Sequence, residues 1–381
     1  MKVIVAAAGT AGHINPGIAI ANKIKKEEKD SEIIFIGTTR GLENDLVPRA
    51  GYKLKTIDAY GLSKKISIDN FKKIIKTAKG FFEARKIVDE FKPDIVIGTG
   101  GYICGAVITA AHKRKIPTVL HESNAFPGKA VKALAKNTDT ILVGFKEAKE
   151  KIKKAKNIVY TGTPVKIKKI NYTDTEKEKM IQDLDLSTNK PIILIFGGSQ
   201  GAQRINESII GIIKNKLNKN YQLIWATGPK QYDIIKEKLE DLQININRVK
   251  DVKIVPYIYD MEQIMNISDV IVSRSGAMTI TEIAMLGKPS ILIPLPNVSN
   301  NHQYYNAMVL KSKNAAEIIL NEELKDEKVL DREIKKIIEN KENMKKMGEN
   351  ALQTATTDAE NKIYNEIKKL VKNNKERIKD V

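Results

Sequence analysis

The sequence predicts an α/β protein with two parallel-sheet domains, and three observations lead to this prediction. Short apolar segments of strand length alternate with longer amphipathic segments, as in a parallel sheet that helices cover on both faces. Three of the apolar segments run directly into glycine-rich turns. The chain has 381 residues, which is more than one hydrophobic core usually serves.

The first alternating series occupies the first half of the chain. Its predicted strands are residues 2–7, 33–37, 54–57, 94–98, 117–121, 139–143 and 158–160. Amphipathic helices are predicted between several of these strands, such as 16–28 and 127–136. The pattern changes near Pro164, and we interpret the polar segment 166–190 as a linker with a short helix. We therefore expect a first domain over residues 1–165.

A second alternating series begins at Ile192. Its predicted strands are residues 192–196, 221–226, 252–256, 269–273 and 290–294. From about residue 322 the pattern is helical and strongly charged. These features predict a second domain over residues 166–355 and a basic helix over 356–381, which we expect to pack back toward the first domain.

The composition narrows the class of protein. Hydrophobic residues make up 42% of the chain and charged residues 29%, as in a soluble globular protein. The single cysteine, Cys104, excludes a disulfide framework and indicates a reducing compartment. No apolar run reaches the roughly 20 residues that a membrane span needs, and the chain enters its first strand without a signal peptide. A cytosolic protein, at most attached to a membrane surface, is therefore expected.

The formal net charge of +19 indicates an anionic partner, which could be nucleic acid, acidic lipid or a phosphorylated substrate. A lysine-rich proteome from an AT-rich genome is the alternative explanation. Nucleic acid is disfavoured because aromatic residues make up only 6% of the chain, and because the sequence has no zinc-finger spacing or base-stacking motif.

The three glycine turns are candidate anion sites. They cover residues 8–13, 98–102 and 197–201. In each turn, glycine lets the backbone approach a ligand closely, and the helix that follows directs free N–H groups and its positive dipole end at an anion. The first and third turns open different domains. Two domains that each bind phosphate indicate a cleft enzyme for a diphosphate-bearing substrate.

The sequence argues against a resident cofactor. The first turn has alanine at the first glycine positions of the dinucleotide fingerprint, and the second strand ends in Gly37-Thr38-Thr39 without a carboxylate for a ribose. The phosphate-binding P-loop motif is absent from the sequence. Four histidines, one cysteine and an aspartate pair within the polar linker do not form a metal motif. We therefore expect no metal, with phosphate charge offset by helix N-termini and basic side chains.

Three polar residues near strand ends are candidates for chemistry. A neutral His13 at a helix N-terminus could act as a general base, and its alternative role is capping or packing. Glu282 follows the donor-rich turn 273–279, and its carboxylate could accept hydrogen bonds from two vicinal ribose hydroxyls. A surface glutamate in the first turn of a helix is the alternative for this residue. Gln303 lies in the polar loop 297–303, which is well placed to contact a sugar.

In order along the chain, these motifs resemble those of the MurG family, glycosyltransferase family 28, which comprises N-acetylglucosaminyltransferases of peptidoglycan synthesis. The segments that carry the resemblance are residues 9–17, 100–102, 121–124, 197–202, 273–277 and 281–284. The resemblance runs from about residue 2 to about residue 355. Each motif alone is weak, whereas the whole set in this order is highly specific.

The resemblance implies the GT-B architecture, in which two Rossmann-like domains face each other across a cleft. The first domain would bind the acceptor and the membrane, and the second would bind UDP-GlcNAc. The implied reaction is inverting transfer of GlcNAc from UDP-GlcNAc to the MurNAc 4-hydroxyl of undecaprenyl-pyrophosphoryl-MurNAc-pentapeptide (lipid I), giving lipid II without a metal or other cofactor. Such an enzyme would serve cell wall synthesis, and hence cell shape and division, as a peripheral protein on the cytoplasmic face of the cell membrane.

By position, the resemblance makes His13 the base that deprotonates the acceptor hydroxyl. The residues that it assigns to the donor are Thr10, Ala11, Gly12, Asn124, Lys166, Ser199, Ile258, Glu282 and Gln303. The diphosphate loops contribute Gly197, Gly198, Gln200, Gly201, Ser275 and Gly276, with Arg274 beside them. Ile258 would contact uracil through its backbone, Glu282 the ribose, and Gln303 the GlcNAc hydroxyls.

Three positions depart from the family pattern. Ala11 stands where glycine is usual, and its methyl group would penalise a positive φ. Lys166 replaces the usual arginine of an Asn-Pro-x-Arg motif, so it keeps the charge but loses the planar fork. His302-Gln303 stands where some members have two glutamines, so Gln303 inherits the sugar contact.

The lipid of the acceptor implies a membrane contact. One predicted helix carries an apolar face flanked by lysines, which is the pattern of an interfacial helix on anionic lipid. The residues of this face are Phe71, Ile74, Ile75 and Phe82. A helix that faces the core is the alternative. Gly80 lowers the stability of this helix by about 1 kcal/mol relative to alanine and is expected to bend it.

Three alternative functions stay open. Another GT-B glycosyltransferase with a lipid acceptor, such as diacylglycerol, would share the donor half. A UDP-sugar 2-epimerase would need several acid and base residues around the sugar, and the loops offer few. A non-catalytic basic binding protein would release no UDP.

Overall fold

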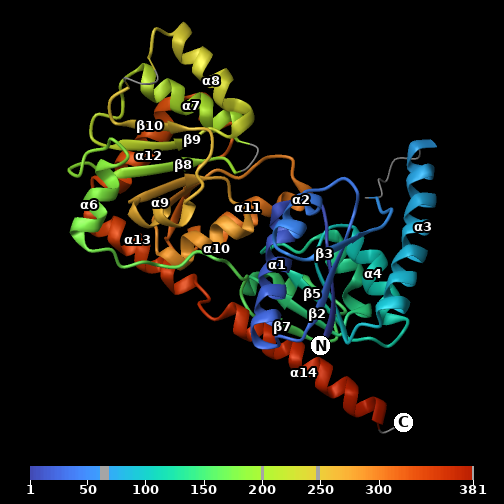
Figure 1. Ribbon diagram of the computed structural model, residues 1–381. Helices are drawn as coiled ribbons and strands as arrows, with labels where there is room; N and C mark the ends of the chain where they lie inside the picture. The colour runs from blue at the N-terminus through green and yellow to red at the C-terminus, as the bar shows by residue number, and fades with distance from the viewer. Residues whose placement is uncertain (61–67, 199–200, 246–248, 380–381) are drawn as a thin grey trace. The chain divides into compact units, whose positions relative to one another are not determined.

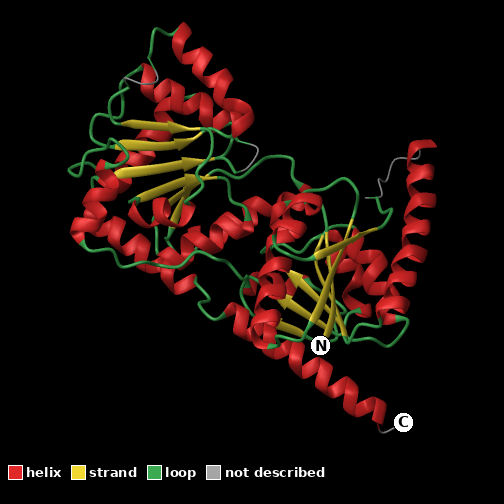
Figure 2. Ribbon diagram, in the orientation of Figure 1, coloured by secondary structure: helices red, strands yellow, loops and turns green. Residues whose placement is uncertain are grey.

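The computed structural model describes the chain in four stretches, residues 1–60, 68–198, 201–245 and 249–379, without the side chains of residues 68–76 and 378. The chain divides into two compact units (Figure 1). The first unit is Met1–Lys166 with Thr356–Val381, and the second is Ile167–Ala355. Each unit is a parallel sheet with helices on its faces (Figure 2), so the predicted fold class of two Rossmann-like α/β domains is confirmed.

Within the described residues, seven parallel strands form the sheet of the first unit, in the order β3-β2-β1-β4-β5-β6-β7. The strands are β1 (Lys2–Ala7), β2 (Glu32–Gly37), β3 (Lys53–Thr56), β4 (Ile95–Gly100), β5 (Thr118–Glu122), β6 (Thr140–Val143) and β7 (Ile158–Tyr160). Val3, Ile4 and Val5 of the central strand β1 are fully buried. Both faces of this strand are therefore covered, which explains its continuous apolar sequence.

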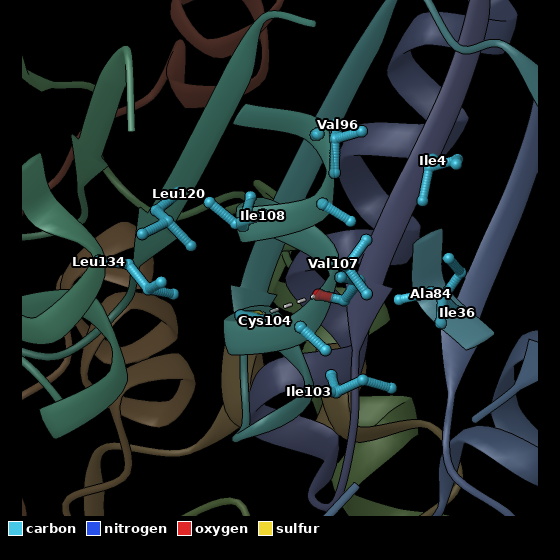
Figure 3. Close-up of a cluster of buried hydrophobic side chains, with 14 of the residues drawn as sticks. Ile4, Ile36, Ala84, Val96, Ile103, Cys104, Val107, Ile108, Leu120 and Leu134 are labelled. Carbon is cyan, nitrogen blue, oxygen red and sulfur yellow. Dashed lines mark hydrogen bonds between the residues drawn. The ribbon is translucent and has the colours of Figure 1, made fainter. Parts of the chain in front are cut away.

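Helices bury both faces of this sheet. They are α1 (Ala11–Glu27), α2 (Glu43–Arg49), α3 (Ile68–Phe91), α4 (Ile103–His112), α5 (Lys129–Leu134) and α14 (Ala359–Lys379), with 3-10 turns at Ala135–Asn137 and Lys146–Lys151. Ile4 belongs to a core with α3 and α4 (Figure 3), whereas Val3 and Val5 belong to a core with α1 and α14. Neighbouring residues of β1 thus serve two cores, because successive side chains of a strand point to opposite faces.

Gly80 lies where helix α3 contacts the loop after β3. A Cβ atom at this position would collide with the carbonyl oxygen of Asp58. The N–H of Asp58 donates to Oε2 of Glu83 at 2.8 Å, and the N–H of Tyr60 donates to Oγ1 of Thr77 at 3.3 Å. Helix α3 continues through Gly80 to Phe91. The absence of a side chain at Gly80 therefore allows the helix and the loop to pack closely. The helix pattern did not predict this packing role.

Within the described residues, six parallel strands form the sheet of the second unit, in the order β10-β9-β8-β11-β12-β13. The strands are β8 (Ile192–Phe196), β9 (Gln222–Ala226), β10 (Val252–Val255), β11 (Val270–Ser273), β12 (Ser290–Leu292) and β13 (Ala316–Ile318). The helices are α6 (Asp174–Gln182), α7 (Gln203–Lys214), α8 (Pro229–Asp241), α9 (Met261–Ile267), α10 (Ala277–Leu286), α11 (His302–Lys311), α12 (Glu327–Ile338) and α13 (Lys341–Thr354), with 3-10 turns at Ser299–Asn301 and Glu323–Lys325. Ile209 of α7 and Ile334 of α12 are fully buried in one core of this unit.

Two elements differ from the sequence prediction. Helix α1 begins at Ala11 rather than at residue 16, because Gly12 and Pro16 lie inside it and hide its helical pattern. Strand β13, Ala316–Ile318, was not predicted. Among the helices that the structure describes, none combines the length and the apolar character needed to cross a bilayer.

Candidate active site

The predicted site residues of the first unit lie where its strands end. The C-terminal ends of parallel strands meet at one edge of the sheet, and ligands of open α/β sheets bind at such edges. Strands β2, β1, β4 and β5 are consecutive in the sheet, so the turns that follow them are neighbours. The structure therefore brings the first glycine turn, the second glycine turn and the turn with Asn124 to the same edge.

The first glycine turn bends at Gly9, which has a φ of +96°. Thr10 has extended backbone angles and is the N-cap of α1, which begins at Ala11. Ala11 is not among the residues with positive φ, so the expected strain from its methyl group is absent. The left-handed position of this turn is Gly9, where glycine is present. Thr10 and Gly12 are exposed at this helix N-terminus.

His13 is held in one orientation by the first turn. Its Nδ1 lies 3.1 Å from the carbonyl oxygen of Ala8. A carbonyl oxygen can only accept, so Nδ1 carries the hydrogen, and Nε2 of the neutral ring keeps its lone pair. The hydroxyl of Thr99 donates to the His13 carbonyl at 2.8 Å. A side chain at Gly100 would collide with the imidazole, so the second glycine turn forms one wall of the His13 site.

Glu43, at the start of α2, is a site residue that the sequence analysis missed. It is fully buried. Its Oε2 accepts from the N–H of Gly9 at 2.9 Å, and its Oε1 accepts from the N–H and the hydroxyl of Thr38 at 2.8 and 2.7 Å. Burial alone would raise the pKa of the Glu43 carboxyl, but these hydrogen bonds outweigh burial and hold the pKa below its ordinary value. The carboxylate thus joins the turns after β1 and β2, and no motif in the sequence marks it.

Glu122 organises the turn after β5. Its Oε1 accepts from the backbone N–H and the side-chain amide of Asn124 at 2.9 and 3.0 Å. Its Oε2 accepts from the N–H of Gly128, the N-cap of α5, at 2.7 Å. The predicted donor contact Asn124 is therefore oriented by a buried carboxylate, because its amide nitrogen points to Glu122.

The surroundings of His121 and Lys166 differ from those of the residues at the glycine turns. The buried His121 donates through Nε2 to the carbonyl of Gly162 at 3.2 Å and accepts from the hydroxyl of Ser123 at 3.3 Å. Burial lowers the pKa of His121 to about 4, so this ring is neutral and structural. Lys166 is exposed where the chain leaves the first unit, and its donor contact stays a prediction.

In the second unit, the third glycine turn joins β8 to α7. Gly198 and Gly201 have φ values of +83° and +73°. A Cβ atom on Gly198 would meet open space, whereas one on Gly201 would lie 2.5 Å from the carbonyl oxygen of Thr227. A side chain at Gly197 would collide with Ala202. The geometry of the turn and its close contacts therefore explain why glycine occupies these three positions. Ser199 and Gln200, the predicted diphosphate contacts between them, lie outside the described residues.

The turn from β11 to α10 contains the predicted site residues Arg274, Ser275 and Gly276. Gly276 is the N-cap of α10 and has extended backbone angles, so N–H groups of the first turn of this helix are not capped by a side chain. The guanidinium of Arg274 donates to the carbonyl of Ile293 at 3.1 Å and to Oδ1 of Asn321 at 2.9 Å. The hydroxyl of Ser275 is buried without a hydrogen-bond partner among the described residues. Arg274 therefore fixes the end of β12 to the turn, and the uncapped N–H groups at the start of α10 are the candidate anion donors here.

Glu282 lies in the second turn of α10. Its side chain is partly buried. Burial raises the pKa of the Glu282 carboxyl to about 7. A carboxyl group that titrates near neutrality and lies on a helix after a glycine turn is typical of a binding site rather than of a solvated surface.

The remaining predicted donor contacts lie in two loops of the same unit. The side chain of Ile258 is buried, so only its backbone can face a ligand, whereas Tyr257 and Tyr259 on either side are exposed. Oε1 of Gln303 accepts from the N–H of Leu295 at 2.9 Å, which leaves its NH2 group to contact a sugar. His302 next to it is half-buried, with Nδ1 2.9 Å from the carbonyl oxygen of Ser299.

The predicted membrane face is described only in part. The side chains of Phe71, Ile74 and Ile75 lie outside the described residues. The Phe82 side chain is 64% exposed, and its ring packs edge-on against Phe81 with centroids 6.0 Å apart. Among the described residues, no three His, Cys, Asp or Glu side chains are grouped as metal ligands would be.

Two family models match the chain. The glycosyltransferase family 28 N-terminal domain matches residues 3–143, and the glycosyltransferase family 28 C-terminal domain matches residues 192–370. A protein of Acetivibrio thermocellus named UDP-N-acetylglucosamine--N-acetylmuramyl-(pentapeptide) pyrophosphoryl-undecaprenol N-acetylglucosamine transferase is 43% identical over 375 residues. The matched region covers 98% of this chain and 99% of that protein.

Solved structures share the fold. The crystal structure of Acinetobacter baumannii MurG has a TM-score of 0.77 at 24% identity and covers 97% of this chain and 99% of its own. A UDP-GlcNAc 2-epimerase from Neisseria meningitidis, solved with UDP-GlcNAc bound, has a TM-score of 0.63 at 17% identity and covers 97% of this chain and 100% of its own. Identities this low show a shared fold only.

Proposed function

The chain belongs to glycosyltransferase family 28, and we propose that it transfers GlcNAc from UDP-GlcNAc to the MurNAc 4-hydroxyl of undecaprenyl-pyrophosphoryl-MurNAc-pentapeptide, giving lipid II. The observation that carries this proposal is the match to the Acetivibrio thermocellus transferase along nearly the whole of both chains. A match of this extent includes both units, and therefore the donor half and the acceptor half alike.

His13 is the proposed general base. The acceptor 4-hydroxyl gives its proton to Nε2 of His13, its oxygen forms a bond to C1 of GlcNAc, and the bond from C1 to the diphosphate oxygen breaks, with the electron pair leaving on UDP. One such displacement inverts the configuration at C1. The hydrogen bond from Nδ1 to the Ala8 carbonyl supports this assignment, because it leaves the lone pair on Nε2.

The second unit is the proposed donor site. The N-termini of α7 and α10 follow its two small-residue turns, and their N–H groups would offset the charge that grows on the leaving diphosphate. This arrangement needs no metal, and UDP-GlcNAc is a substrate rather than a cofactor. Glu282 would accept from the ribose hydroxyls, the backbone of Ile258 would bind uracil, and the NH2 group of Gln303 would donate to a GlcNAc hydroxyl.

Helix α3 is the proposed membrane contact. The exposed ring of Phe82 supports it, because an aromatic side chain on the outer face of a helix can insert into the interface of a bilayer. Lys79, Arg85 and Lys86 are exposed along the same helix. Cations beside an exposed aromatic ring suit an anionic lipid surface. The protein would then act as a peripheral protein on the cytoplasmic face of the cell membrane.

The test is transfer of labelled sugar to a short-chain lipid I analogue, with UDP-GlcNAc, UDP-glucose and UDP-galactose as donors. Of the three donors, we expect only UDP-GlcNAc to give a product. We expect this product only when the acceptor is present. Equal transfer to diacylglycerol would contradict the proposed acceptor.

A second outcome is of interest because an epimerase shares this fold. Conversion of UDP-GlcNAc to UDP-ManNAc without an acceptor would replace the proposed transferase by a 2-epimerase. The same samples can be analysed for this product by chromatography, so one experiment decides between the two activities.

A further inference from the structure

The peptide group between Ala8 and Gly9 is hydrogen-bonded at both of its ends. Its N–H donates to Oε2 of Glu43 at 2.9 Å. Its carbonyl oxygen accepts from Nδ1 of His13 at 3.1 Å. A single amide therefore separates the carboxylate of Glu43 from the imidazole of His13.

Glycines provide the space for the Glu43 carboxylate, the Ala8–Gly9 peptide and the His13 imidazole. A Cβ atom on Gly41 would collide with the Glu43 carboxylate, and one on Gly37 would lie 2.6 Å from Cγ of Glu43. On the other side, a Cβ atom on Gly101 would lie 2.7 Å from the Ala8 carbonyl oxygen. A Cβ atom on Gly100 would likewise collide with the His13 ring. Side chains at these glycines would displace the carboxylate, the peptide or the imidazole.

Glu43 is bonded as an anion. All its partners are donors, namely the N–H of Gly9 and the N–H and hydroxyl of Thr38. These bonds favour the charged form, and they hold the pKa of the Glu43 carboxyl below its ordinary value although burial opposes them. A buried carboxylate therefore faces the N–H of the peptide whose carbonyl binds His13.

We propose that Glu43 is a positioning residue for His13 and acts on it through the Ala8–Gly9 peptide. The inference rests on the proposed role of His13 as general base. A carboxylate at the N–H end polarises the amide and makes its carbonyl oxygen a stronger acceptor, since hydrogen bonds in a chain strengthen one another. The stronger acceptor holds the Nδ1–H tautomer and stabilises the imidazolium that forms when Nε2 takes the acceptor proton. This is the role of the carboxylate in a catalytic triad, with one peptide inserted. Glu43 itself takes no proton.

Among the residues that the structure describes, the other charged or titratable groups on the turns around His13 do not have this geometry. They are Arg40 after β2, Tyr102 and Cys104 at the start of α4, and Glu122 at the end of β5. The Arg40 guanidinium lies 3.7 Å from the ring centroid of Tyr60 and donates to the Ala59 carbonyl. Burial raises the pKa of the Cys104 thiol to about 12, so it is neutral. Glu122 binds the turn after β5. The lysines of α1 begin at Lys23, near the far end of that helix.

The test compares Glu43→Gln with a matched control in the same unit. Oδ2 of Asp139 accepts from the N–H and hydroxyl of Thr118 at 3.0 and 2.9 Å, the same pair of donors that Thr38 offers to Glu43. Asp139 lies where β6 begins, at the end of the sheet opposite to His13. Asp139→Asn therefore removes a similar carboxylate without touching the arrangement at His13.

For Glu43→Gln we expect kcat to fall by about 10- to 100-fold, the range known for outer partners of metal-bound histidines. The acid limb of kcat/KM for the lipid I analogue, measured at saturating UDP-GlcNAc, should move to lower pH, because the imidazolium loses its stabilising charge. The Kd of UDP-GlcNAc should not change. Asp139→Asn should lower the melting temperature but leave kcat and the acid limb at wild-type values. A Glu43→Gln enzyme with wild-type kcat and pH profile would overturn the proposal.

Two further measurements separate this proposal from the proposed function. In 15N-histidine NMR of the wild-type protein, His13 should carry its hydrogen on Nδ1 at neutral pH, and an Nε2–H tautomer would overturn the proposal even if Glu43→Gln does not fold. The double variant His13→Ala/Glu43→Gln should be no slower than His13→Ala, because a partner of His13 has nothing to act on without it. Wild-type turnover by His13→Ala would instead refute the base assignment, and with it the mechanism on which this proposal rests.

Discussion

Binding of the sugar nucleotide should depend on the ionisation of Glu282. Burial raises the pKa of this carboxyl to about 7, whereas a solvated glutamate ionises more than two pH units lower. The carboxylate offers each ribose hydroxyl its own charged acceptor oxygen, whereas the protonated group turns one of these oxygens into a donor. As the pH falls through about 7, the form that accepts both bonds is therefore lost, and UDP-GlcNAc should bind more weakly.

The magnitude follows from the fraction of carboxylate. With a pKa of about 7, the charged fraction is about nine-tenths at pH 8, one-half at pH 7 and one-tenth at pH 6. The apparent Kd scales with the inverse of this fraction, so it should rise about tenfold from pH 8 to pH 6. At pH 7, binding should release about half a proton, because the ligand selects the ionised form.

Isothermal titration calorimetry without the acceptor measures both quantities, with buffers of different ionisation enthalpy for the proton count. UDP-GlcNAc is used rather than UDP, because a terminal phosphate has a second ionisation near pH 6. Glu282→Gln keeps the side-chain shape and should bind more weakly with a Kd that is constant from pH 6 to 8. A wild-type Kd that changes less than twofold over this range would refute the ribose assignment or the raised pKa.

Three further predictions concern the first unit. His13→Ala should leave the Kd of UDP-GlcNAc unchanged and reduce turnover by roughly 10²- to 10⁴-fold, the usual contribution of a general base, and wild-type turnover would remove this residue from the mechanism. Gly80→Ala should lower the melting temperature, because its Cβ would collide with the Asp58 carbonyl, at a cost of about 1–3 kcal/mol that exceeds the gain in helix propensity of about 1 kcal/mol. Gly105→Ala in α4 is the matched control, since its Cβ would meet open space and should stabilise the helix; equal effects of both substitutions would contradict the packing role of Gly80. Cys104 should resist thiol reagents in the native protein and react after denaturation, because it is buried and its pKa is raised to about 12.

Most of the fold could be predicted from local pattern. The strands over residues 192–196 and 158–160 have the predicted bounds. Buried parallel strands are continuous apolar runs bounded by turn residues, so the sequence marks them directly. Helix α1 was placed too far along the chain, because Gly12 and Pro16 are poor helix formers that tertiary contacts nevertheless hold in a helix.

The site could be predicted only where backbone chemistry determines it. The glycines at positions 9, 198 and 201 adopt positive φ, and their place after buried strands is visible in the sequence. The protein partners of Arg274 could not be predicted, since its guanidinium binds Ile293 and Asn321, which are distant in the sequence. A sequence pattern reports what a residue type can do but not which partner occupies its donors.

The sequence by itself therefore determined the two parallel sheets, the turns at the ends of their strands and the family. Periodicity and glycine spacing are local, and they encode burial and backbone conformation. Only the tertiary structure decided which groups meet at those turns. Glu43 reaches the N–H of Gly9 across 34 positions of the chain, and Gly80 meets the carbonyl of Asp58 because a helix packs on a loop. Such contacts arise from the order of strands in the sheet and the packing of helices on it, which no short stretch of sequence specifies.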